Sequence, residues 1–131
     1  MCGRTDVDDY AGLPSGILYA GATCVLSSLW CVDDTATAVL MDTFYREWRE
    51  EGRSVAAALV KAQRWLRDST GQQLRDELAK GGFFDRIDDQ AQRDGCRTWA
   101  DAIARRYLDR PPFSSPAYWA SFAAVGWAMS P

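Results

Sequence analysis

The sequence predicts an α/β fold in which a small sheet is covered by helices. Two short apolar runs have the composition of strands, residues 23–29 and residues 122–127. About five other segments repeat apolar residues every three or four positions, as amphipathic helices do. A chain of 131 residues, of which 47% are hydrophobic, is long enough for one domain with its own core.

The first part of the chain predicts a loop, a helix and a strand. Residues 1–10 show no periodicity and are expected to form a loop or frayed terminus. Pro14 suits a first helical turn, and the small residues after it predict a helix that ends at Gly21 and lies close to a sheet. The continuous apolar run at residues 23–29 then predicts a buried strand.

Two amphipathic helices are predicted next, packed as a hairpin. Asp33 or Asp34 can cap the first helix, because a carboxylate there accepts hydrogen bonds from free backbone N–H groups. Gly52 ends this helix and Ser54 caps the second. The short connection between them favours antiparallel packing. The apolar stripes comprise Ala36, Val39, Leu40, Thr43, Phe44 and Trp48 in the first helix, and Val55, Ala58, Leu59, Ala62, Trp65 and Leu66 in the second.

The remaining elements are shorter or less regular. A helix is predicted at residues 70–80, and the charged segment after it is ambiguous, with a possible helix at residues 85–93. Thr98 and Asp101 have the spacing of a capping box, which predicts a helix start at this point. A turn of helix at residues 117–121 leads into the second strand. Two strands leave the sheet incomplete, since a stable sheet usually has three or more strands or a covering layer.

Composition and charge exclude several classes of protein. The chain carries 15 basic and 18 acidic residues, a net charge of -3, and no basic block that would follow a phosphate backbone. We therefore expect no direct nucleic-acid partner. The start is polar and acidic, and no apolar run approaches the roughly 20 residues of a membrane span. These features predict a soluble, cytoplasmic protein without membrane contact.

Cysteine and histidine content limits the possible chemistry. Cys2, Cys24, Cys31 and Cys96 fit neither a C-x-x-C pair nor a dense disulfide framework, so reduced thiols are expected. The sequence contains no histidine. Cys/His and Ser/His catalysis need an imidazole, and most zinc sites also recruit one. We expect no metal or organic cofactor.

Several short sequence motifs, in a fixed order along the chain, resemble those of a known family. They are GLPSG at residues 12–16, SSLWCVDD at 27–34, AAAL at 56–59, AQRWLR at 62–67 and PFSSPAYWASF at 112–122. Together they resemble the CHAT domain, a caspase-like cysteine peptidase module often attached to tetratricopeptide repeats. The resemblance implies that residues 12–131 form the C-terminal, small-subunit-like half of a caspase-like three-layer sandwich, preceded by a flexible segment at residues 1–11.

The resemblance also implies where a nucleophile would lie. In the family, the missing N-terminal half brings the central parallel strands and the catalytic histidine. The nucleophilic cysteine follows in a word close to Ser-Ala-Cys-x-Thr-Gly. Cys2 is the candidate nucleophile by position, although no strand precedes it and Gly3-Arg4 departs from the order of residues in this motif. The alternative interpretation is an inert thiol on the terminus.

A candidate substrate wall follows the first strand. In the related separase proteases, a similar Leu-Trp-x-Val-x-Asp word contributes an aspartate to a pocket for arginine, and this position corresponds to Asp34. We expect one of Asp33 and Asp34 to cap the helix and the other to face a substrate groove. Trp30 packs beneath that pocket or fills the core. Cys31 lines the pocket or serves as packing.

Two functions remain open from the sequence. The first is a truncated or divergent CHAT-domain protein that keeps part of the specificity wall but has no complete Cys/His dyad. It would hydrolyse peptides only if the missing histidine-bearing half were supplied. The second is a non-catalytic module that binds a partner, or a second copy of itself, through an exposed sheet edge. The expected partners are thus a protein or peptide substrate, or the missing domain half.

Overall fold

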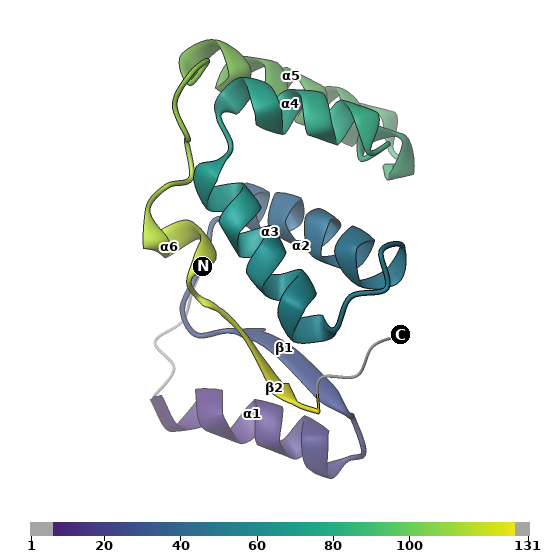
Figure 1. Cartoon of the computed structure of the whole chain (residues 1–131), viewed down its shortest axis with the longest axis vertical. Helices are drawn as coiled ribbons and strands as arrows, with labels where there is room; N and C mark the ends of the chain where they lie inside the picture. Colours follow the sequence, from purple (N-terminus) through teal and green to yellow (C-terminus); the bar gives the residue numbers. More distant parts are fainter. Residues whose placement is uncertain (1–6, 128–131) are drawn as a thin grey trace.

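The protein is a stack of helical and sheet layers along its long axis (Figure 1). The computed structural model describes the backbone of residues 7–127 and the side chains of residues 12–127. Helix α1 (Val7–Tyr19) lies at one end of the stack, against a two-stranded sheet. Two helical hairpins follow on the other side of the sheet. This arrangement is a helix-rich α/β fold with two strands, as predicted.

The sheet pairs the two predicted strands in antiparallel register. Strand β1 (Cys24–Ser28) aligns Cys24 with Gly126 and Ser28 with Phe122 of β2 (Phe122–Gly126). The prediction that the first strand is buried is wrong, because all five residues of β1 are only half-buried. One edge of β1 has no neighbouring strand within the described part of the chain. Both strand predictions are otherwise confirmed.

Helix α1 begins earlier than the sequence suggested. It starts at Val7 rather than near Leu13, so that Pro14 lies inside the helix instead of in its first turn. No apolar repeat marks the residues before Leu13, and periodicity therefore could not place the start. The end of the helix is as expected: Gly21, with a φ of 106°, ends the last turn, and its N–H donates to the carbonyl of Leu18 at 3.0 Å.

The first hairpin forms the centre of the core. It consists of α2 (Asp34–Arg49) and α3 (Val55–Asp68), which begin after the caps Asp33 and Ser54. Gly52 takes a φ of 63° in the turn between them, which favours glycine. The predicted apolar stripes face each other. The buried residues of the two helices include Ala36, Val39, Leu40, Phe44, Val55, Ala58, Leu59, Ala62 and Leu66.

The second hairpin consists of α4 (Gly71–Lys80) and α5 (Gln90–Arg106), joined through the short 3-10 helix η1 (Phe84–Arg86). Helix α4 begins with a complete capping box, in which the Thr70 hydroxyl accepts from the N–H of Gln73 and the Gln73 side chain accepts from the N–H of Thr70. Leu74 and Leu78 anchor this helix in the core, as predicted.

The predicted capping box at Thr98 and Asp101 is wrong. Helix α5 begins at Gln90, where Asp89 accepts a hydrogen bond from the N–H of Gln92 at 2.7 Å. Thr98 lies in the helix interior, and its hydroxyl donates to the carbonyl of Asp94 at 2.8 Å. A threonine three residues before an aspartate has the spacing of a capping box whether it caps a helix or lies inside one. The sequence alone therefore did not distinguish a capping Thr98 from an interior Thr98 whose hydroxyl bonds the preceding turn.

The chain returns to the sheet through α6 (Pro116–Trp119), a single turn capped by Ser115. The side-chain amide of Gln63 in α3 donates to the carbonyls of Trp119 and Phe122, both at 3.0 Å. These two bonds fix the junction of α6 and β2 against the first hairpin. Within residues 7–127, no helix has the length and apolar character that a membrane crossing requires.

Candidate recognition wall at the end of β1

The residues between β1 and α2 form an exposed wall beside α6. The N–H of Leu29 donates to the carbonyl of Ser121 at 2.8 Å, which extends the strand ladder past Ser28. The indole N–H of Trp30 donates to the carbonyl of Ala117 in α6 at 3.2 Å. We call residues 29–34 the β1–α2 wall. These two hydrogen bonds fix the wall to the residue before β2 and to helix α6.

The two aspartates of the β1–α2 wall have different surroundings. Asp33 is the cap of α2: its Oδ1 accepts from the N–H of Thr35 at 3.1 Å and from the N–H of Ala36 at 2.8 Å. Asp34 occupies the first helical position and is exposed. Its carboxylate has no hydrogen-bond or ion-pair partner among residues 12–127. Asp34 is thus the aspartate whose charge is available to a ligand.

Trp30 and Cys31 lie at the surface rather than in the core. Trp30 is 39% exposed, so the interpretation as a core residue is wrong. Its ring is held in place by the bond to Ala117. Cys31 is exposed and disulfide-bonded, which contradicts the expectation of a reduced, packed thiol. Cys24 and Cys96 are free and half-buried against the core, as small apolar residues are. Cys2 lies outside the described residues.

The described residues supply no imidazole for catalysis. Histidine is missing from the entire 131-residue sequence. Residues 12–127 also contain no group of three or more side chains that would ligate a metal. The β1–α2 wall can therefore contribute charge and an aromatic surface to recognition.

A groove follows the outer edge of β1, which the sequence did not reveal. It encloses about 410 Å³ between β1, α1 and α2. Its lining includes Ile17, Thr23, Cys24, Val25, Leu26, Phe44, Tyr45, Trp48, Val55 and Trp127. Consecutive residues of β1 line it, so it runs along the strand edge and not over one face. The indole N–H of Trp48 is buried and has no partner among the described residues.

Within the described part of the chain, the backbone of β1 presents unpaired groups along its outer edge. The bonds Leu29 N–H to Ser121 and Trp127 N–H to Thr23 show that odd-numbered residues face β2. Alternate residues of an antiparallel strand point the opposite way. The N–H and C=O groups of Cys24, Leu26 and Ser28 therefore face outward. Another extended segment can pair with them.

Comparison with known protein families places the chain in a domain family. The family model described as CHAT domain matches residues 1–127, nearly the whole chain. Neither the curated proteins nor the solved structures include a match.

Proposed function

This chain belongs to the CHAT domain family, and from that membership we propose that it supplies the substrate-recognition part of a caspase-like cysteine endopeptidase. The observation that carries the proposal is the exposed carboxylate of Asp34 in the β1–α2 wall, which has no partner among residues 12–127. A carboxylate in this state forms paired, charge-assisted hydrogen bonds with a guanidinium group. The substrate class is thus a peptide or protein with arginine at the cleavage site.

The chain has no complete Cys/His dyad, because it contains no histidine. Cys2 is the candidate nucleophile, and a histidine outside these 131 residues would be its base. The thiolate would then attack the scissile carbonyl, while the imidazole passes the proton to the leaving amine. Water would release the acyl group afterward. The open edge of β1 supports this arrangement, since a histidine-bearing segment can dock there as a further strand.

Peptide binding and turnover test this function separately. We expect the purified chain to bind a peptide ending in arginine more tightly than the same peptide ending in citrulline, its uncharged isostere. Asp34→Asn should abolish this preference, because it removes the charge from the β1–α2 wall. Asp109→Asn, which removes another exposed negative charge far from the β1–α2 wall in sequence, is the matched control and should leave binding unchanged. Fluorescence anisotropy measures both affinities.

The same peptides should not be hydrolysed by the chain alone. Equal affinity for the arginine and citrulline peptides would overturn the role of Asp34. Turnover that is lost on Cys2→Ala would overturn the absence of a working dyad. Peptide affinity and peptide hydrolysis are measured independently, so the experiment tests recognition and catalysis separately.

A non-catalytic binding module is the second candidate function, and the groove along β1 favours it. The outward-facing backbone groups of β1 and the aromatic side chains that line the groove suit strand addition from another chain. We take a second copy of this chain as the occupant to test. Tyr45 lines the groove and is 52% exposed.

Sedimentation experiments test the second function. The apparent mass should rise with protein concentration, and Tyr45→Glu should shift this association to about tenfold higher concentration, because the buried charge must be desolvated. Leu108→Glu is the control, since Leu108 follows the C-cap of α5, is 53% exposed and lines no part of the groove. A mass that stays constant at the monomer value would contradict self-association.

A further inference from the structure

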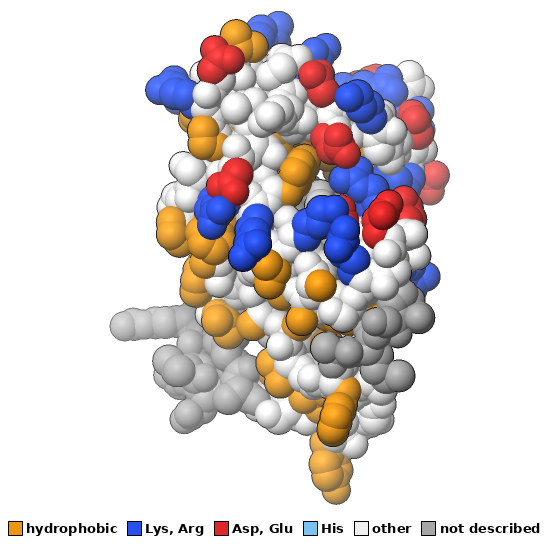
Figure 2. Space-filling model, viewed as in Figure 1, with side chains coloured by type: hydrophobic (Ala, Val, Ile, Leu, Met, Phe, Trp, Pro, Cys, Tyr) orange, Lys and Arg blue, Asp and Glu red, His pale blue; other side chains and the backbone are white. Residues whose placement is uncertain are grey.

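A charged cleft separates α3 from α4, away from the β1–α2 wall. The two helices diverge from the turn at Ser69 and Thr70 and enclose about 570 Å³ between them. Charged side chains gather over this half of the molecule, whereas hydrophobic ones gather around the sheet (Figure 2). The lining consists of Lys61, Arg64, Trp65, Asp68, Ser69, Gln73, Asp76, Glu77 and Lys80.

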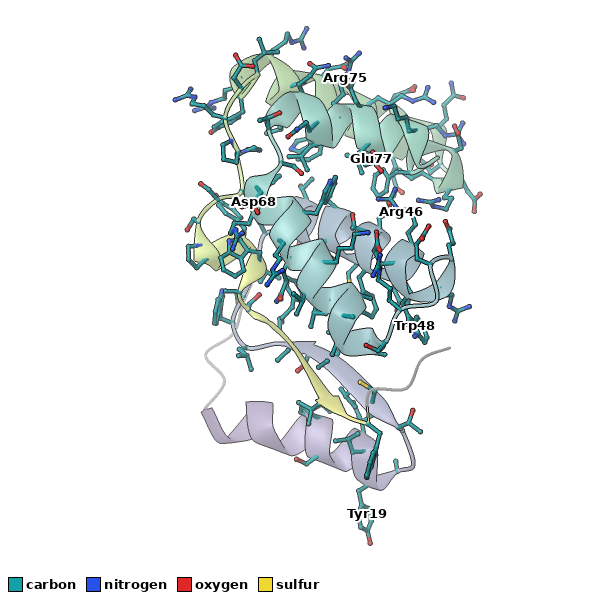
Figure 3. All side chains as sticks on the ribbon, in the orientation of Figure 1. Tyr19, Arg46, Trp48, Asp68, Arg75 and Glu77 are labelled. Carbon is teal, nitrogen blue, oxygen red and sulfur yellow. The ribbon has the colours of Figure 1, made fainter. Side chains whose placement is uncertain are left out.

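Every acidic side chain of the cleft already has a cationic or amide partner. Glu77 pairs with Arg46 of α2 at 3.2 Å, and Figure 3 shows the two side chains in the gap between the hairpins. Asp68 accepts two bonds from Arg67, at 2.6 and 2.7 Å. Their negative charges are therefore compensated by residues of this chain.

Asp76 is the third acid of the cleft. It accepts two bonds from the side-chain amide of Gln72, at 3.0 and 3.1 Å, and lies 3.6 Å from the guanidinium of Arg75. None of the three carboxylates is thus left to attract a cation into the cleft.

Two cations of the cleft have no such partner. Lys61 is held by Glu47 at 2.8 Å. Arg64 on the α3 wall and Lys80 on the α4 wall are both exposed, and neither forms an ion pair or hydrogen bond with residues 12–127. Hydrogen bonds from Arg67 lower the pKa of the Asp68 carboxyl, and the nearby charge of Arg64 adds to this effect without a direct contact. The groups left for a ligand are therefore two positive charges on opposite walls. Trp65, half-buried against the core, adds an aromatic surface to the same cleft.

We propose that this cleft binds an acidic peptide segment of a partner protein, with carboxylates held by Arg64 and Lys80. A volume near 570 Å³ is in the range of ligand sites in proteins. The net charge of the chain is -3, so anions are not attracted to the molecule as a whole. Recognition therefore depends on these two cations at short range, within a screening length of about 10 Å.

The proposal goes beyond recognition at the β1–α2 wall and has its own test. A short fluorescein-labelled polyglutamate peptide should bind, and a polyglutamine peptide of the same length should not. Arg64→Gln and Lys80→Gln should each weaken binding about tenfold, the effect of one charge-assisted contact. Arg105→Gln is the matched control, because Arg105 is an exposed cation in the last turn of α5 and has no ion pair among the described residues. It should bind as the unaltered chain does.

Further measurements decide the remaining outcomes. Circular dichroism should show that all three variants keep the helical content of the unaltered chain, since the substituted residues are exposed. Failure of polyglutamate to bind, or an equal loss in Arg105→Gln, would overturn the proposal. Displacement of the peptide by free glutamate at equal carboxylate concentration would also overturn it, since the site would then recognise small carboxylates rather than a peptide segment.

Discussion

Substitution of Gly71 by alanine is expected to lower the free energy of unfolding by about 3 kcal/mol. A Cβ atom at this position would lie 2.6 Å from the carbonyl oxygen of Ile103 and 2.7 Å from that of Tyr107. Both are backbone atoms near the end of α5, so they cannot rotate away. The N–H of Gly71 also donates to Tyr107 at 2.8 Å, a bond that the displaced helix would lose. Urea unfolding followed by tryptophan fluorescence measures the change.

Gly95→Ala is the matched control for this substitution. Gly95 lies inside α5, and an added Cβ would meet no atom within 4 Å. Because alanine favours a helix interior over glycine, this variant should gain about 0.5–1 kcal/mol. Equal destabilisation of the two variants would show that the close approach of α4 to the end of α5 is not what requires glycine at position 71.

Substitution of Glu47 by glutamine is expected to cost about 2 kcal/mol at neutral pH. Glu47 is buried in α2, and its carboxylate accepts from Arg53 and from Lys61, both at 2.8 Å. Glutamine keeps the size of the side chain but loses both charge-assisted contacts. The two cations are about half exposed, which limits the loss compared with a fully buried pair.

The cost of this substitution should depend on pH. Burial alone would raise the pKa of Glu47, but hydrogen bonds and charge from Lys61 and Arg53 outweigh it and lower the pKa below the ordinary 4.5. The folded state therefore binds fewer protons than the unfolded state in this range. The contribution of Glu47 is present above pH 4.5 and is lost as the pH falls through the lowered pKa.

Urea unfolding across this pH range measures the effect. The difference in unfolding free energy between the unaltered chain and Glu47→Gln should shrink as the pH falls below 4.5. Glu51→Gln is the control, because Glu51 is exposed and has no ion pair among the described residues. It should show little cost at any pH. A difference for Glu47→Gln that stays constant with pH would contradict the ion-pair explanation.

Local signals predicted the first hairpin well. Asp33 and Ser54 each cap a helix of this hairpin, because free N–H groups at a helix start need an acceptor whatever the rest of the fold. The same kind of signal failed at Thr98, where the hydroxyl bonds the preceding turn. A cap and an interior threonine differ only in the backbone before them, which the sequence pattern did not determine.

The candidate site was predicted in part. Trp30, Cys31, Asp33 and Asp34 lie together because they are neighbours in sequence between a strand and a helix. The choice of Asp33 as the cap came from the structure, since either carboxylate fitted the spacing. The surface position of Trp30 depends on its bond to α6, which lies far along the chain. The role of Cys2 stays a prediction.

The sequence by itself determined the family, the α/β class, the two strands and the lack of an imidazole. Each of these features follows from which residues are present and from their spacing over short stretches of the chain. Only the tertiary structure decided where the open edge of β1 lies, and that Arg64 and Lys80 line a cleft without an ion pair or hydrogen bond to the described residues. Grooves and uncompensated charges arise between elements distant in sequence. Their formation depends on how those elements pack, which no local pattern encodes.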